Sequence, residues 1–190
     1  MSQIKRAYRF RCYPTSKQRQ VLVRTFGCCR WVYNQALARK TTAYRGAGQR
    51  LSYGDLSALL PIWKTQAETA WLSEVSSVPL QQSLRHLDRA FVNFFEGRTK
   101  YPTHKKKQGP QAATYTSSAF HWQDGQLTLA KMATPLAILW SRTLPEGAVP
   151  STVTVSRDAA GRYFVSLLVE EEMPPVAPDA CCCRRGSGIA

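Results

Sequence analysis

The sequence predicts an α+β fold in which a small β-barrel is interrupted by an inserted helical region. Three observations support this. Residues 5–13 alternate apolar and polar side chains as a strand does, residues 15–97 carry apolar residues at helical spacing, and alternation returns after residue 112. A first strand, several helices and then more strands fit a barrel whose first strand pairs with strands far along the chain. The 190 residues suffice for one domain, or one and a half.

The first strand is predicted to have one apolar face and one basic face, because successive side chains of a strand point to opposite sides. Its apolar face carries Tyr8, Phe10 and Cys12. Arg9 and Arg11 fall on the other face, and a proline follows the strand at position 14 and ends it.

Two helices are expected next. Thr15 or Ser16 caps the first, which begins at Lys17, and Gly27 permits a break or close packing. The second helix runs from about residue 28 to residue 44, and glycines at 46 and 48 end it. Its inward stripe is Cys29, Val32, Tyr33, Ala36 and Leu37.

The remaining helical pattern contains one short helix and one long helix. Ser52 caps the short helix and Pro61 stops it, with Trp63 and Trp71 as core anchors behind it. Ser76 or Ser77 begins the long helix, which has a proline in its first turn. Its apolar stripe is Leu80, Leu84, Leu87, Phe91 and Phe94.

The last third of the chain reads as strands. The expected strands are residues 115–122, 137–140, 152–155 and 163–169. Asp124-Gly125 predicts a hairpin, with Leu127 and Leu129 alternating after it, and residues 158–161 predict a turn.

Charge predicts a polyanionic partner. The first acid is Asp55, and the residues before it include twelve Lys or Arg, while the whole chain carries a net charge of +14. Nucleic acid is the usual partner for such a profile, and a solvated basic face without a partner is the alternative. No apolar run reaches membrane-spanning length and no signal peptide is visible, so we expect a cytoplasmic, nucleoid-associated protein with neither a membrane nor a small-molecule partner.

The candidate contacts to a nucleic-acid backbone are basic or amide side chains spread over the chain. They are Lys5, Arg9, Arg11, Arg30, Asn34, Arg85, Arg89, Lys100, Lys105, Lys106 and Lys107. The lysine run lies in a basic loop, residues 98–108, where it follows Tyr101 and Pro102. An aromatic and a rigid residue beside the run favour a nucleic-acid clamp, although a solvated turn is the other interpretation.

No catalytic or metal-binding residue is predicted. Cys12, Cys28 and Cys29 form no CxxC pair, so Cys12 and one of the adjacent two are interpreted as core residues. The three consecutive acids at 170–172 fall at a strand end and point to alternate faces, which makes a poor site for metal ions.

Several motifs in order resemble the N-terminal part of TnpB (OrfB) proteins of bacterial insertion sequences. They are residues 8–15, 26–37, 80–91, 93–95, 100–107 and 153–158. The resemblance covers residues 1 to about 175. It implies an RNA-guided DNA endonuclease related to type V CRISPR effectors, with guide RNA and double-stranded target DNA as partners.

The resemblance also implies a domain plan. Residues 1–14 form the first strand of a wedge β-barrel, residues 15–97 a helical recognition domain, and residues 98–175 the basic loop and remaining wedge strands. A helix-turn-helix-like region spans about residues 1–46. The family's RuvC nuclease domain, with its divalent metal, and its zinc ribbon are expected to be absent, so we expect no cofactor and no cleavage by this chain.

Motif-reading residues are implied by the resemblance at four positions. These are Tyr53, Ser57, Ser77 and Gln81. Their side chains suit base edges, since Gln pairs bidentately with adenine and Ser and Tyr donate or accept hydrogen bonds. Ser77 stands where family members carry a long basic residue, and a helix cap or ordinary surface residue is the alternative role for each.

The tail, residues 176–190, contains three consecutive cysteines, Cys181 to Cys183. Permitted codons, read one nucleotide later, spell the first strand of a RuvC domain, so we hypothesise a frameshift near residues 178–180. A metal-binding tail is the alternative. Three functions stay open: a truncated TnpB-type protein that binds nucleic acid without cutting it, a nuclease-free DNA-binding regulator of transposition, and a stand-alone RNA-binding protein.

Overall fold

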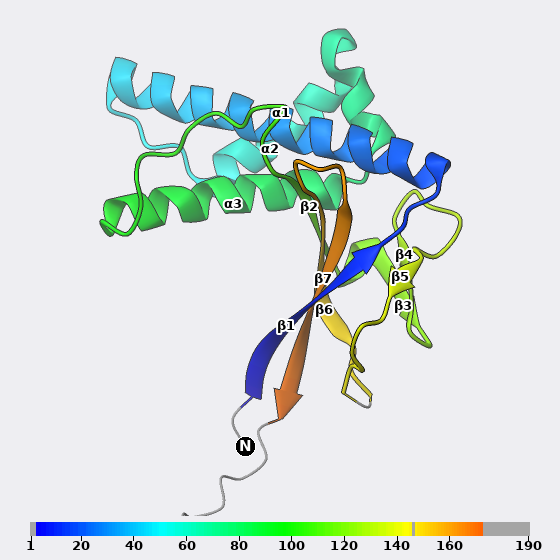
Figure 1. The fold of residues 1–190 in the computed structure, drawn as a ribbon. Helices are drawn as coiled ribbons and strands as arrows, with labels where there is room; N and C mark the ends of the chain where they lie inside the picture. Colours follow the sequence, from blue (N-terminus) through cyan, green and yellow to red (C-terminus); the bar gives the residue numbers. More distant parts are fainter. Residues whose placement is uncertain (1–2, 146, 173–190) are drawn as a thin grey trace, which may run out of the picture.

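The computed structural model describes residues 3–145 and 147–172, which form a layer of helices beside an antiparallel sheet (Figure 1). The elements in chain order are β1 (Gln3–Cys12), α1 (Ser16–Ala47), α2 (Tyr53–Thr65), η1 (Ala67–Glu74), α3 (Ser77–Phe95), β2 (Gln111–Thr116), η2 (Ser117–Ala119), β3 (Phe120–Gln123), β4 (Gln126–Leu129), β5 (Ile138–Leu139), β6 (Pro150–Arg157) and β7 (Tyr163–Glu172). The predicted α+β order is confirmed. Among these described helices, none is long and apolar enough to cross a membrane.

The main sheet joins the two ends of the described chain. Its strand order is β2-β6-β7-β1-β5, and β3 and β4 form a separate two-stranded sheet. β1 pairs antiparallel with β7 from Gln3 opposite Glu172 to Cys12 opposite Tyr163. The predicted pairing of the first strand with a distant one is therefore confirmed. In this order β2 and β5 are the two edge strands, so the sheet is open rather than closed into a barrel.

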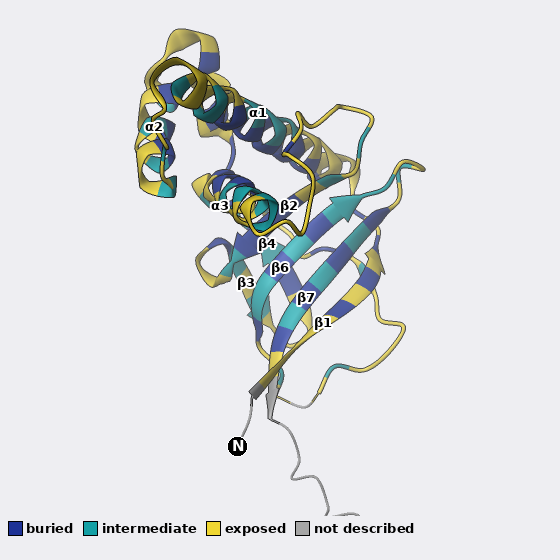
Figure 2. Cartoon of the chain, turned by 90° about the vertical axis from the view of Figure 1, so that its left-hand side faces the viewer, coloured by how far each residue is buried: buried dark blue, intermediate teal, exposed yellow. Residues whose placement is uncertain are grey.

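β1 has the two faces that its alternation predicts (Figure 2). Tyr8, Phe10 and Cys12 are buried at 8%, 1% and 2% exposure. Arg9 and Arg11 are exposed. The apolar face thus contributes to the core, and the basic face stays available to solvent.

α1 is one continuous helix, so the predicted break at Gly27 is wrong. Thr15 caps it and forms a capping box with Gln18, and Gly48, with φ 63°, ends it. A glycine inside a helix costs about 1 kcal/mol, which is too little to interrupt a helix that buries apolar residues on both sides of it. Here Phe26 and Cys28 flank the glycine and are both 2% exposed.

α2 passes through Pro61, so the predicted stop there is also wrong. Ser52 and Asp55 form its capping box as expected for the start. The proline is exposed, whereas Leu60 and Trp63 beside it are buried at 4% and 3%. Burial of these neighbours outweighs the loss of one hydrogen bond at the proline.

Trp71 is a less complete anchor than Trp63. Its side chain is 38% exposed, although its ring meets the ring of Trp31 edge-on with 5.6 Å between centroids. It belongs to η1, a 3₁₀ segment that covers part of α1. The prediction that both tryptophans lie in the core is therefore confirmed only for Trp63.

α3 begins after Ser76, as predicted, and it is the central helix of the layer because it packs against α1, α2 and β2. Leu80, Leu84 and Leu87 are fully buried. Phe91 and Phe94 are only half-buried. The apolar stripe thus leaves the core toward the C-terminal end of the helix.

Two strand predictions need correction. Residues 115–122 are not one strand, because β2 ends at Thr116, η2 turns the chain, and β3 then pairs with β4 in the other sheet. The strand expected at 137–140 is reduced to β5, which pairs only with the end of β1. The hairpin at Asp124-Gly125 is confirmed, since both residues have the positive φ, 49° and 74°, of a type I′ turn.

Cys12, Cys28 and Cys29 are all buried, so the expectation that only one of the adjacent pair lies in the core is wrong. Cys29 lies against α3, where its Sγ is 3.5 Å from the Pro79 carbonyl oxygen. η1 covers another side of α1, so Cys28 and Cys29 are both shielded from solvent. Burial raises the pKa of Cys12 and Cys28 to about 12 and that of Cys29 to about 11. Cys181 to Cys183 and the hypothesised frameshift lie outside the described residues.

Candidate nucleic-acid interface

The basic loop returns along α1 and is fixed to it by a side-chain amide. Asn34 Nδ2 donates to the Lys105 carbonyl oxygen at 3.0 Å, and Asn34 Oδ1 accepts from the Lys105 amide at 2.8 Å. Asn34 was predicted to contact a nucleic-acid backbone. In the structure its amide binds the protein backbone instead, so its position favours shaping the loop.

Two further contacts hold the ends of the loop. At the start, the Tyr101 hydroxyl is 3.0 Å from the Thr41 hydroxyl. At the end, Gln111 Nε2 donates to the Lys107 carbonyl oxygen at 2.6 Å. The lysine run is therefore presented by a backbone that is anchored before, within and after it.

Within the run, the lysines differ in their surroundings. The Lys105 ammonium lies 4.2 Å from the centre of the Tyr33 ring, and desolvation there lowers its pKa. All three lysines are nevertheless exposed. Arg30, one turn before Asn34 on α1, lines the same small cleft as Lys105 and Lys106. We call Arg30 and Lys105–Lys107 the loop cluster.

The basic face of β1 is partly occupied by contacts within the protein. Lys5 pairs with Glu170 at 3.0 Å. The Arg9 guanidinium lies 4.2 Å from the centre of the Phe164 ring, and that of Arg11 lies 5.3 Å from the Tyr13 ring. Exposed contacts of this kind are weak, and an arginine stacked on an aromatic ring keeps its outer edge free for a phosphate.

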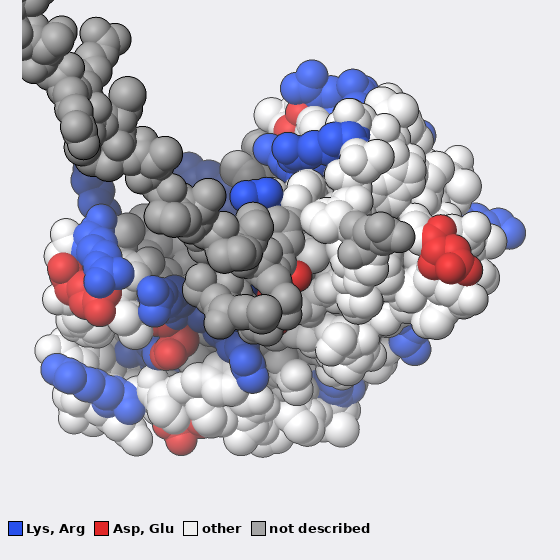
Figure 3. All heavy atoms as spheres, turned by 90° about the horizontal axis from the view of Figure 1, so that it is seen from below, with Lys and Arg blue, Asp and Glu red and all other residues white. Residues whose placement is uncertain are grey.

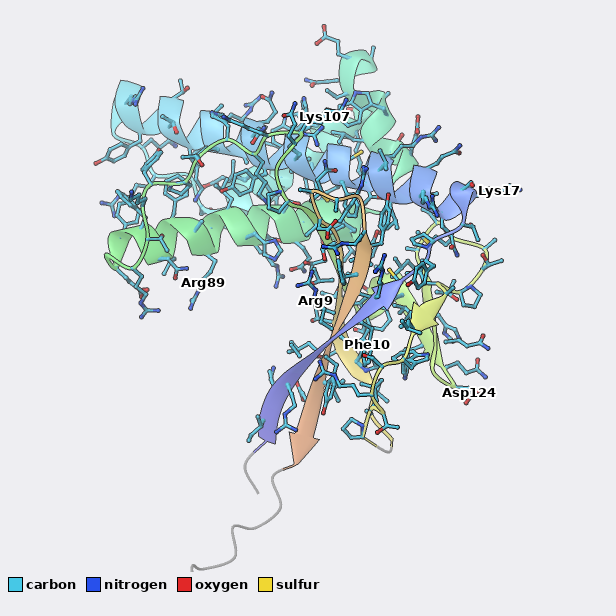
Figure 4. The ribbon with its side chains drawn as sticks, viewed as in Figure 1. Arg9, Phe10, Lys17, Arg89, Lys107 and Asp124 are labelled. Atoms are coloured by element: carbon cyan, nitrogen blue, oxygen red, sulfur yellow. The ribbon has the colours of Figure 1, made fainter. Side chains whose placement is uncertain are left out.

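The predicted backbone contacts do not form one continuous surface. Figure 4 shows Lys107 beside α1 and Arg89 projecting from the underside of α3, on the side of the helical layer where β1 carries Arg9. The view from below shows acidic side chains interspersed among the lysines and arginines (Figure 3). The loop cluster is thus separate from the cations near β1.

The predicted motif-reading residues lie along two adjacent helices. Arg85 Nε is 3.5 Å from the Tyr53 hydroxyl at one end, and Lys64 Nζ donates to Ser77 Oγ at the other. These contacts fix α2 and α3 as antiparallel. Ser57 and Gln81 fall between the two contacts, each one helical turn from a contacting residue. We call Tyr53, Ser57, Ser77 and Gln81 the α2–α3 strip.

Lys64 and Tyr33 belong to these surfaces although sequence reasoning missed them. The Lys64 ammonium group donates a hydrogen bond to the Ser77 hydroxyl, and desolvation lowers the pKa of that ammonium group. The helical pattern placed Tyr33 only in the inward stripe of its helix, and neither contact could be predicted from the sequence, because each joins separate elements. Within residues 3–145 and 147–172, no three His, Cys, Asp or Glu side chains lie close enough to hold a metal ion.

Comparisons with known proteins place these surfaces in context. A family model described as a helix-turn-helix domain, of the OrfB proteins of IS605 elements, matches residues 1–49. In the structure those residues include β1 and the single helix α1. The chain is 56% identical over 190 residues to a Streptomyces pristinaespiralis protein described as an RNA-guided DNA endonuclease.

The chain is also 32% identical over 189 residues to InsQ of Escherichia coli strain K12, which has the same description. These alignments take in 100% and 97% of this chain but 47% and 45% of the relatives. The chain therefore spans about half the length of the curated relatives it matches. A chain in the solved Cas12f1–sgRNA–target DNA complex aligns with a TM-score of 0.47 and 12% identity, over 90% of this chain and 49% of that one.

Proposed function

Because this chain belongs to the TnpB (OrfB) family and corresponds to its N-terminal region, we propose that it is a nucleic-acid-binding unit that holds guide RNA and double-stranded target DNA. The names of its relatives, which span twice its length, support this assignment. We assign nucleic-acid binding, and no cleavage step, to the residues of this chain.

The observation that carries the proposal is the anchored basic loop. Asn34 binds both backbone groups of Lys105, and Lys106 and Lys107 remain exposed beside it. A loop that is already ordered loses less conformational entropy when it binds a phosphate backbone. The loop cluster therefore supports a role as a backbone clamp that is indifferent to sequence.

Recognition of sequence is assigned to the α2–α3 strip. Gln81 is exposed, and its amide can pair with two groups on the major-groove edge of adenine. Arg85 stands one turn further along α3 and contacts Tyr53, so a cation that can bind a phosphate lies next to a base reader. Phosphate contacts would set the register in which the strip meets the DNA.

Purification of the chain from its native host, followed by sequencing of the nucleic acid that accompanies it, tests the proposal. A discrete RNA from the end of the parent element is the expected result. Retention of a matching DNA duplex by that complex would add the second partner. Random nucleic acid or none would contradict guide binding, and a discrete RNA without any duplex binding would favour the stand-alone RNA-binding function.

A further inference from the structure

The C-terminal ends of α1 and α3 form a pocket that the proposed function does not use. It has a volume of about 540 Å³. Its aromatic lining consists of Tyr44, Phe91, Phe94, Phe95 and Tyr101. This volume falls in the range of roughly 300–1,000 Å³ that is usual for sites that bind small molecules. We call it the aromatic pocket.

The rings of the aromatic pocket are ordered by one another yet open to solvent. The rings of Phe91 and Phe95 are stacked at 6.3 Å, and Tyr101 meets Phe91 edge-on at 5.6 Å. Tyr44 and Phe95 are 57% and 67% exposed. An exposed aromatic cluster of this kind indicates a site for a ligand or a partner molecule.

The charges around the aromatic pocket select an anionic partner. Arg45 and Arg50 line it, and neither forms an ion pair with any described residue. The guanidinium of Arg50 lies 5.7 Å from the centre of the Phe95 ring. Asp88, the acid in the lining, is neutralised by Lys40 at 3.1 Å. Aromatic faces beside unpaired guanidinium groups match a nucleobase with its flanking phosphates.

We propose that the aromatic pocket binds an unpaired nucleobase of a single-stranded nucleic acid, with the neighbouring phosphates on Arg45 and Arg50. This inference rests on the proposed function and adds a second kind of contact, since stacking requires a base whereas the loop cluster requires only phosphates. A stacked base contributes about 1–3 kcal/mol, which corresponds to roughly 5- to 150-fold in affinity.

Fluorescence anisotropy with the purified full chain tests this. The probes are a short oligouridine and the same oligomer with abasic sites, which has the same charge. The wild type is expected to bind the oligouridine at least about 5-fold more tightly. Phe95→Leu keeps apolar area but removes the ring, so it should abolish the preference, whereas Phe95→Trp should retain it. Tyr13→Ala, which removes a ring that is 51% exposed near the other end of α1, is the control and should leave the preference for the oligouridine unchanged.

The outcomes separate the two proposals. Equal affinity for both oligomers, lost together when Lys106 and Lys107 become alanine, would overturn the pocket and leave the backbone clamp standing. Absence of any binding would overturn both. Loss of self-association in Phe95→Leu without a change in oligomer binding, measured by sedimentation, would overturn the pocket in favour of a protein interface. A deoxyuridine oligomer distinguishes RNA from DNA as the source of the base.

Discussion

Asn34 in α1 binds both backbone groups of Lys105, a residue 71 positions later in the chain. The contact joins the longest helix to a loop without regular secondary structure. It leaves the Lys105 side chain over the Tyr33 ring, one residue before Asn34. Neighbouring residues of α1 therefore fix the backbone and the side chain of the same lysine.

Asn34→Ala should release the loop. Two backbone hydrogen bonds are lost, and each net contribution is about 0.5–1.5 kcal/mol, so the free energy of unfolding should fall by about 1–3 kcal/mol. Trypsin should cleave faster after Lys105 to Lys107, which limited proteolysis with mass spectrometry would measure. Gln35→Ala, at an exposed neighbouring position, is the control. Unchanged cleavage would show that other contacts hold the loop.

Replacing Lys106 and Lys107 by alanine should weaken binding to all nucleic-acid sequences alike. Each lost phosphate contact reduces the slope of log affinity against log salt by about one. Titrations between roughly 50 and 200 mM salt would measure the slope. Lys17→Ala with Lys131→Ala removes the same charge outside the loop and should have a smaller effect. Equal effects of the two pairs would mean that only net charge matters.

Gly27→Ala should stabilise the protein. Nothing lies within 4 Å of a Cβ built at this position, and the helix is continuous there. Alanine should therefore raise the free energy of unfolding by about 0.4–1 kcal/mol, as measured by urea denaturation. Gly48→Ala should do the opposite, because φ is 63° at that residue. Destabilisation by Gly27→Ala would indicate that the helix bends at this glycine in solution.

Asp55→Ala should destabilise α2 in a manner that depends on pH. Hydrogen bonds from the Ser52 amide and hydroxyl lower the pKa of Asp55 below its ordinary 3.8. A lowered pKa in the folded state means that the stabilisation is present above pH 3.8 and is lost as the pH falls through the folded value. The gap in Tm between the wild type and Asp55→Ala should be widest near neutral pH and close in acid. A Tm gap that does not depend on pH would exclude the ionised Asp55 carboxylate as the source of the stabilisation.

Gln81→Ala should relax sequence preference without a general loss of affinity. A bidentate pair with a base discriminates by about 1–3 kcal/mol, whereas phosphate contacts elsewhere are unaffected. Selection from a randomised duplex library by the complex with its RNA would measure the preference. Gln82→Ala, at the neighbouring position, is the matched control. Identical preferences for wild type and Gln81→Ala would remove this residue from the proposed strip.

The sequence predicted correctly those features of the fold that depend on neighbouring residues alone. The faces of β1 follow from alternation, and the hairpin at Asp124-Gly125 follows from the positive φ that these residue types tolerate. Gly27 and Pro61 misled the prediction because both usually interrupt helices. In this protein, burial of the apolar residues beside them stabilises each helix by more than the glycine or the proline destabilises it.

The candidate site was less accessible to sequence reasoning. The basic residues of the loop are visible as a run, but the partner of Asn34 is determined by how the loop returns along α1. The contacts of Tyr53 with Arg85 and of Lys64 with Ser77 also depend on the packing of two helices. Residue type identified these positions as polar, and only tertiary structure assigned their partners.

The pairing of β1 with β7 has a consequence for synthesis on the ribosome. β1 is made first, yet the strand that pairs with its whole length is β7, residues 163–172. The helices between them can form as they emerge, because their backbone hydrogen bonds are local, whereas most of β1 must wait with an unpaired edge. A nascent chain stalled before β7 should therefore have a helical layer and a first strand paired only at its end, with β5, and this intermediate is the one on which a chaperone would act.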